Sequence, residues 1–180
     1  MKLITLSLIA TLAGSAAFAM NPQVGGADMF ETKNIVENAM NSADHTTLVA
    51  AVAAAGLVET LQGEGPFTVF APVNAAFDAL PAGTVETLLK PENKDQLVKI
   101  LTCHVVGANA MSKAIGGMIA DDGGSHDVTT LGGCILKAQM DGDWITLTDE
   151  NGGVAKVTIA DVVQSNGVIH VIDAVLLPKM

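Results

Sequence analysis

Apolar residues in the first half of the chain recur at the spacing of amphipathic helices. This spacing predicts one helix over residues 33–43 and a second over residues 45–55, which ends at Gly56. Weaker patterns of the same kind predict short helices at residues 57–61, 84–89 and 93–101. Between them, the run Phe67-Thr68-Val69-Phe70 alternates in the manner of a strand. It ends at Pro72, and Asn74 is expected to cap a short helix through Phe77.

The second half of the chain has the pattern of a sheet. After a helix expected at residues 111–119 and a Gly/Asp loop at 121–124, strands are predicted at 127–131, 134–139, 144–148 and 154–159. The last apolar run, Val168–Leu177, has too few polar positions for an edge strand. A helix-rich first half and a strand-rich second half predict the α+β class.

The ends of this pattern indicate the domain organisation. Residues 1–19 have the form of a secretory signal: Lys2, an apolar stretch, and an Ala17-Phe18-Ala19 cleavage site. Residues 20–31 contain Pro22, Gly25 and Gly26 without periodicity, and are expected to form a flexible lead-in. Residues 32–180 are then one domain. No later segment is as long and uncharged as the signal, so the mature protein is expected to be secreted or periplasmic, without a transmembrane segment; the alternative is a retained N-terminal anchor.

Charge excludes one class of partner. The chain has a formal net charge of −10, and all nine of its basic residues are lysines. The negative field repels nucleic acid and anionic lipid, and no arginine is present to form two parallel hydrogen bonds to a phosphate. We therefore expect no nucleic-acid partner.

Residue patterns for catalysis or metal binding are missing from the sequence. No G-x-S-x-G or C-x-x-C motif occurs, and on a strand Cys103 and His104 would face opposite sides. The other histidines are scattered, and His170 lies among Val and Ile, where a buried structural role is expected. The acidic groups at 141–143 and 149–153 lack the order of a calcium loop. We expect no enzyme, no cofactor and no metal site.

Cys103 and Cys134 are the two cysteines of the chain. In an exported protein they are expected to form a disulfide; the alternative is two separately buried thiols. A bridge would close a loop of about 30 residues and contribute about 3 to 4 kcal/mol.

Two long segments resemble the paired signature motifs of the fasciclin domain. These are FTVFAPVNAAF at 67–77 and NGVIHVIDAVLLP at 166–178, with LTCHVV at 101–106 between them. The resemblance implies helices packed against a wedge of β-strands, and a non-catalytic role in adhesion. The signature positions expected to fix this fold are Phe67, Phe70, Pro72, Asn74, Phe77, Asn166, Gly167, His170 and Asp173.

The resemblance also implies positions for partner binding. An acidic residue followed by Ile precedes the last motif in animal members, and here this pair corresponds to Asp161 and Val162. A Tyr-His pair is the second such place; His104 matches, but Cys103 replaces the tyrosine. Val73 stands where threonine is usual, so a side-chain cap before Asn74 is lost.

Two functions from different classes fit these observations. The first is an exported recognition domain that binds a cell-surface or matrix protein or polysaccharide. The alternative is a periplasmic carrier of a small hydrophobic ligand, for which a high content of Ala, Val and Met is suitable. A plain hydrophobic core accounts for the same residues.

Overall fold

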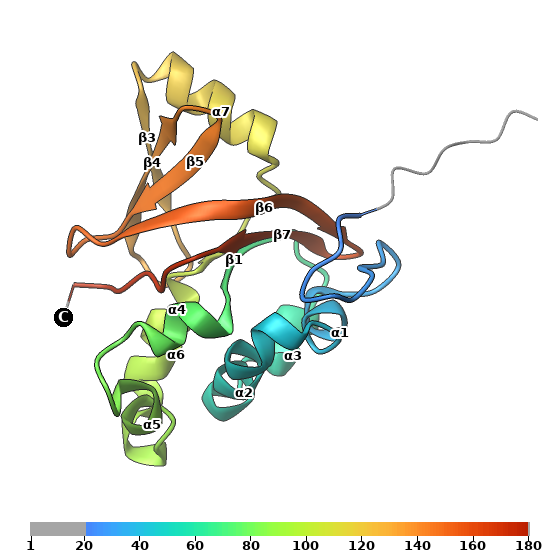
Figure 1. Cartoon of the computed structure of the whole chain (residues 1–180), viewed down its shortest axis with the longest axis vertical. Coiled ribbons are helices and arrows are strands. Elements are labelled where there is room, and N and C mark those ends of the chain that lie inside the picture. The colour runs from blue at the N-terminus through green and yellow to red at the C-terminus, as the bar shows by residue number, and fades with distance from the viewer. Residues whose placement is uncertain (1–20, 180) are drawn as a thin grey trace, which may run out of the picture.

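The computed structural model describes residues 21–179, which fold into one seven-stranded sheet with helices on two sides (Figure 1). The strand order is β2-β1-β7-β6-β5-β4-β3. The strands are β1 (Phe67–Pro72), β2 (Val105–Val106), β3 (Ser125–Thr129), β4 (Ile135–Asp141), β5 (Trp144–Thr148), β6 (Val154–Gln164) and β7 (Gly167–Ile172). The predicted α+β class, helices against a β-strand wedge, is confirmed.

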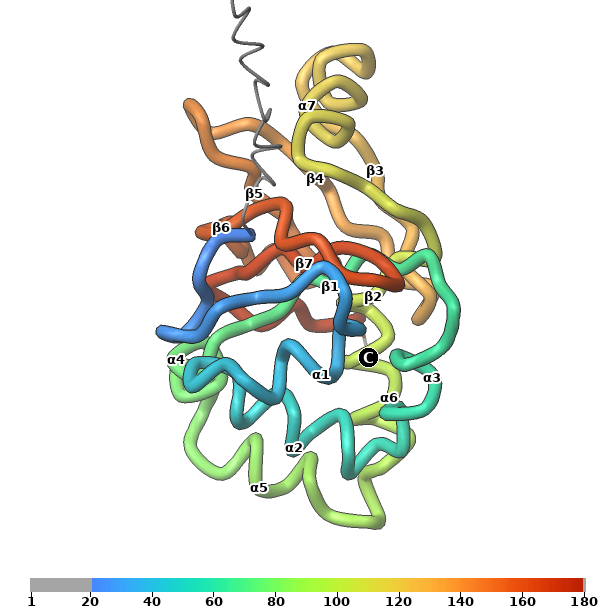
Figure 2. Tube along the Cα trace, turned by 90° about the vertical axis from the view of Figure 1, so that its right-hand side faces the viewer, coloured from blue at the N-terminus to red at the C-terminus, as the bar shows by residue number. Residues whose placement is uncertain are grey.

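Seven α-helices and two 3₁₀ helices surround the described part of the sheet. They are α1 (Ile35–Ala39), η1 (Ala43–His45), α2 (Thr46–Ala55), α3 (Val58–Gln62), α4 (Asn74–Asp78), α5 (Thr84–Leu88), η2 (Pro91–Asn93), α6 (Lys94–Thr102) and α7 (Ser112–Asp121). Helices α1 to α6 gather at the β1 end of the sheet, and α7 lies at the β3 end (Figures 1 and 2). Within residues 21–179, none of the helices has the length and apolar character needed to cross a membrane.

The two signature segments lie side by side in the centre of the sheet. β1 and β7 pair in parallel, with Phe67 opposite Gly167 and Phe70 opposite His170. Strand β7 is antiparallel to β6 on its other side, and all six of its residues are buried. The prediction that this run is not an edge strand is confirmed. The strand is shorter than the predicted run, however: it ends at Ile172, and residues 173–179 leave the sheet as a tail.

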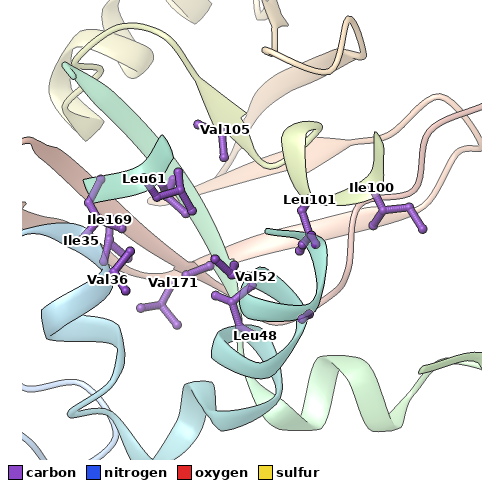
Figure 3. Packing of buried hydrophobic residues seen from close by; sticks show 14 of the residues in the cluster. Ile35, Val36, Leu48, Val52, Leu61, Ile100, Leu101, Val105, Ile169 and Val171 are labelled. Atoms are coloured by element: carbon purple, nitrogen blue, oxygen red, sulfur yellow. The ribbon is translucent and has the colours of Figure 1, made fainter. Parts of the chain in front are cut away.

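Hydrophobic cores on both faces of β1 and β7 explain their continuous apolar runs. One core joins helices α1, α2, α3 and α6 to one face, through Val69, Ile169 and Val171 (Figure 3). The other core joins α7 and strands β4 to β6 to the opposite face, through Phe70 and Ile172. A strand buried on both faces lacks the alternation of a half-buried strand.

Residues 21–31 are packed against the domain, which differs from the flexible lead-in expected from their composition. Val24 and Met29 are buried in the helical core, and the Asn21 side chain bonds the backbone of Val163 in β6 in both directions. A two-residue turn at Gly25 and Gly26 brings the segment back on itself. Because only two isolated apolar residues make this packing, the segment has no hydrophobic periodicity from which the packing could be predicted.

The amide of Asn74 caps a different helix from the one expected. Its Oδ1 accepts hydrogen bonds from the Thr47 backbone N–H at 3.0 Å and the Thr46 hydroxyl at 3.2 Å. Its Nδ2 donates to the Ala43 carbonyl at 2.9 Å. Asn74 thereby satisfies the N-terminus of α2, which has no side-chain cap of its own. Val73, as expected, provides no side-chain cap to α4.

Candidate functional site

Asp161 lies on a bulge of β6 and anchors helix α7. Its backbone is left-handed, with φ of 57°, and the β6–β7 register shifts on either side of Ile159. The Asp161 Oδ1 accepts the Ser112 backbone N–H at 2.6 Å, and Oδ2 accepts the Ser112 hydroxyl. A carboxylate at these groups satisfies a free N–H of the helix and interacts favourably with its N-terminus. Both carboxylate oxygens of Asp161 therefore already accept hydrogen bonds, and the residue is half-buried.

His170 completes this network below the bulge. Its Nδ1 accepts the Asp161 backbone N–H at 3.2 Å, and its Nε2 donates to the Ala110 carbonyl at 2.7 Å. The ring is fully buried and stacks on Phe70 at 5.7 Å between centroids. Burial lowers the pKa of His170 from its ordinary value of 6.5. The expected buried, hydrogen-bonded histidine is thus present, and it holds β7 to the segment before α7.

The other two residues predicted to bind a partner, Val162 and His104, are buried. The His104 Nδ1 donates to the Ile100 carbonyl at 2.8 Å, and its Nε2 accepts the Leu176 backbone N–H at 2.9 Å. The histidine therefore fixes the C-terminal tail on α6. Strands β1 and β7 separate β2, which follows His104, from β6. The three predicted residues do not form one site, and only Asp161 is open to a partner in this conformation.

Signature residue Asn166 also connects helices to the sheet. Its Oδ1 accepts the Ile35 backbone N–H at 3.0 Å, at the start of α1. Its Nδ2 donates to the carbonyls of Leu61 and Gly63, each at 2.8 Å, at the end of α3. Asp173 similarly accepts the Lys156 backbone N–H at 2.7 Å, between β7 and β6. The buried signature positions Pro72 and Phe77 contribute packing rather than polar chemistry.

Acidic residues of the β5–β6 turn hold the C-terminal tail. Asp149 Oδ1 accepts the N–H groups of Asn151 and Gly153, at 2.9 and 2.8 Å, and Oδ2 accepts that of Leu177 at 2.9 Å. Glu150 accepts the Lys179 N–H at 2.9 Å. These carboxylates bond backbone donors, and among residues 21–179 no group of three or more His, Cys, Asp or Glu is arranged to hold a metal.

Cys103 and Cys134 form a disulfide, with their Cα atoms 5.4 Å apart. The bridge links the end of α6 to the start of β4, and both residues are buried. The close approach of the two cysteines favours the disulfide over two separate thiols, the alternative that the sequence left open. A thiol nucleophile at either position would first require reduction of the bridge.

Removal of the disulfide is expected to lower the free energy of unfolding by about 3 to 4 kcal/mol, since the bridge spans 31 residues. Urea unfolding of a Cys103→Ala/Cys134→Ala variant, beside the wild type with and without reductant, measures this. Alanine leaves no unpaired polar group in the core. Reductant should destabilise the wild type and leave the variant unchanged. A loss below about 1 kcal/mol would show that the bridge is dispensable.

An apolar pocket of about 230 Å³ lies between helices α1 to α3 and the sheet. Aliphatic side chains from the helices and from the sheet line it, and several of them, such as Leu48, Val52 and Ile169, are labelled in Figure 3. Met40, 66 % exposed, and Ala53 mark its opening to solvent. The helical wall is Ile35, Val36, Ala39, Leu48, Val49, Val52, Ala53, Leu57, Val58 and Leu61, and the sheet wall includes Val69, Ala71, Val105, Val162 and Ile169.

The outer face of strands β3 to β6 is a second exposed feature. Helix α7 covers the inner face (Figure 1), and side chains of the outer face alternate with the buried ones. Trp144, the single tryptophan, is 46 % exposed there, and Lys156 Nζ lies 4.1 Å from its ring centroid. The sequence predicted these strands but gave no sign that this face stays uncovered, because alternation does not identify what covers each face.

This outer face is neutral in a strongly acidic chain. Lys137 and Lys156 are balanced by Asp127 and Asp141, which occupy outward positions of the same strands. Thr146, Thr148 and Gln139 lie between them. The face thus combines an aromatic ring, hydroxyl and amide groups, and no net charge.

Several known proteins are similar in sequence to most of this chain. The protein sll1483 of Synechocystis sp. is 53 % identical over 81 % of this chain and 74 % of its own length. Immunogenic protein MPB70 of Mycobacterium bovis is 36 % identical over 78 % of this chain and 66 % of its own. Human periostin is 33 % identical over 75 % of this chain, but over only 15 % of its own length.

A solved structure shows the same fold. It is a FAS1 domain pair from the insect cell adhesion molecule Fasciclin I, with a TM-score of 0.71 over 81 % of this chain and 51 % of the other, at 17 % identity. The family model of the fasciclin domain matches residues 43–178. The chain belongs to the fasciclin domain family.

Proposed function

We propose that this chain is an exported, non-catalytic recognition domain that binds a cell-surface or matrix protein or polysaccharide. Membership of the fasciclin family and the similarity to a domain pair of a cell adhesion molecule support an adhesion-like role. The signal that predicts export lies in residues 1–19, outside the described residues. The observation that carries the proposal is the neutral outer face of β3 to β6, with its half-exposed Trp144.

The physical reason for choosing this face is its chemistry. An exposed aromatic side chain contributes a large contact area at a small entropic cost, and tryptophan is enriched among the residues that dominate binding energy. The net charge of −10 repels the anionic surfaces of cells, whereas a locally neutral face reduces that repulsion at the point of contact. Thr and Gln side chains around the ring supply hydrogen bonds to a polar partner.

Replacement of Trp144 by alanine is expected to weaken binding to intact cells or extracellular material of the source at least about tenfold. Saturable binding of the labelled mature domain measures the effect. Phe30→Ala is the matched control: Phe30 is also an exposed aromatic side chain, 47 % exposed, with a lysine 5.0 Å from its ring. Its affinity should not change. Equal losses in the two variants would contradict a role for the outer face.

Asp161 is tested in the same assay, since the sequence predicts contact there. Asp161→Asn removes the charge while it keeps a side-chain acceptor for Ser112 and a residue that tolerates the left-handed backbone. Loss of binding in this variant, with Trp144→Ala unaffected, would move the contact surface to the bulge of β6. Absence of binding by the wild type would reject the recognition function itself.

The alternative function, carriage of a small hydrophobic ligand, has one specific observation in its favour. This is the apolar pocket between α1, α2, α3 and the sheet.

A further inference from the structure

The apolar pocket is unsuited to water. The polar side chains at its wall already have partners: Ser42 Oγ and His45 Nδ1 lie 2.8 Å apart, and both nitrogens of His104 bond backbone groups. Among the described residues, no buried side-chain nitrogen or oxygen lacks a hydrogen-bond partner. A buried water needs two to four polar partners, and this wall offers none that are free.

The size of the pocket points to an occupant. An apolar cavity of about 150 Å³ in another protein stays dry and binds benzene. The pocket of this chain, at about 230 Å³, is larger and has a similarly aliphatic lining. Protein interiors otherwise contain few voids larger than a water molecule. An apolar molecule would restore the dispersion contacts that the unfilled wall lacks.

Access and adaptability fit a ligand that enters from solvent. Met40 and Ala53 lie exposed at the rim, so the pocket is not sealed within the core. Met29, from the segment before α1, also contributes to the wall. Methionine side chains are flexible and adjust to ligands of different outline.

Charge decides between a neutral and an anionic amphiphile. Helices α1, α2 and α3 carry Glu37 and Glu59 and no lysine, while Lys94 of α6 lies beside Gly56 at the end of α2. No charged side chain is among the described residues that line the pocket itself, so an anionic head group would find no cationic partner in its wall, whereas a neutral molecule needs none.

We propose that this pocket binds a neutral, predominantly aliphatic small molecule, with its apolar part between α1–α3 and the sheet. The proposal deepens the alternative function, carriage of a hydrophobic ligand, because it names the ligand class and the position of the site. It is independent of recognition through the outer face, which lies on the other part of the sheet.

Fluorescence titration with N-phenyl-1-naphthylamine, a neutral apolar probe, tests the proposal on the mature protein. We expect saturable binding of one probe per chain, and displacement by 1-decanol. Decanoate, which has the same chain length and a negative charge, should compete several-fold less well at low salt. The difference should narrow as salt rises, because screening weakens the repulsion.

Neighbouring alanines of α2 provide a matched pair of variants. Ala53 lines the pocket, and Ala54 is an exposed residue of the same helix outside the lining. Ala53→Trp is expected to weaken probe binding at least about tenfold by filling the opening, while Ala54→Trp leaves it unchanged. Circular dichroism establishes that both variants fold. If Ala53→Trp does not fold, the comparison of 1-decanol with decanoate on the wild type decides.

The outcomes separate this proposal from the recognition function. Absence of saturable probe binding by the wild type overturns the pocket proposal, as does equal affinity in two folded tryptophan variants. Preferential binding of decanoate overturns the assignment of a neutral ligand. Trp144→Ala should retain probe binding, and Ala53→Trp should retain binding to cells, so that either function can fail without the other.

Discussion

Alanine at Gly167 is expected to prevent stable folding, with a loss of more than about 4 kcal/mol in the free energy of unfolding. Gly167 begins β7 and lies opposite Phe67 in the parallel β1–β7 pair. A Cβ atom there would overlap the Phe67 carbonyl oxygen and lie 2.8 and 2.9 Å from the Phe67 carbonyl carbon and nitrogen. These are backbone atoms in the centre of the sheet, so relief of the overlap requires separating the two strands.

The loss is large relative to the whole stability of a domain, which is about 5 to 15 kcal/mol. Urea unfolding followed by circular dichroism measures it. Gly116→Ala is the control in the opposite direction: Gly116 lies in α7, and a Cβ there meets no atom within 4 Å. That variant should gain about 0.5 to 1 kcal/mol from the higher helix propensity of alanine. A folded Gly167→Ala protein within about 1 kcal/mol of the wild type would contradict the overlap.

The strand that begins at Gly167 illustrates which features of the fold can be predicted from the sequence. The run after this glycine was expected to be an internal strand because of its apolar residues, and the structure places it at the centre of the sheet. Short-range patterns of this kind identify the type of each element, since they depend on one residue and its near neighbours. The order of the strands is not local information, and it was not predicted from the sequence.

Polar contacts between residues distant in the chain could not be predicted either, because they too depend on more than near neighbours in sequence. Asn74 and Asn166 were noted as signature positions, yet each bonds helix ends that are distant in the chain. An asparagine just before a short helix favours a cap on that same helix. The sequence around Asn74 does not indicate that its side chain instead bonds the N-terminus of α2, which lies earlier in the chain. Element boundaries moved for a similar reason: β6 continues past the predicted residue 159 to Gln164, through a bulge at Asp161.

The candidate surfaces were the least predictable part. Asp161, Val162 and His104 were predicted from family position, and the structure shows that two of them are buried. Trp144 and the pocket depend on what remains uncovered after the helices pack, which no residue pattern states. A hydrophobic residue in a core and one beside an empty space have the same spacing in sequence.

Mild acid is expected to destabilise the domain through its three buried histidines. Burial is the main cause that lowers the pKa values of His45, His104 and His170 from 6.5, and for His104 the value is about 4. Hydrogen bonds to backbone carbonyls and the nearby carboxylates of Asp44, Asp149 and Asp161 oppose this effect only in part. All three rings are therefore neutral in the folded protein at neutral pH.

The direction of the pH effect follows from proton binding. Below pH 6.5 the unfolded chain binds protons at these histidines, whereas the folded protein does not until the pH reaches the lowered pKa values. Stability is then full above about pH 6.5 and falls as the pH decreases toward 4. For His104 alone the shift corresponds to a loss of about 3 kcal/mol, with 1.36 kcal/mol per unit. His45 and His170 add to this loss.

Urea unfolding at intervals from pH 7.5 to 4.5 measures the loss before most carboxylates titrate. His104→Gln should lose stability at pH 7.5, because the bonds to Ile100 and Leu176 change, but its stability should then fall less steeply with pH. A wild-type free energy that stays constant from pH 7 to pH 5 would show that water reaches these rings. The two cores would then be more open than their packing indicates.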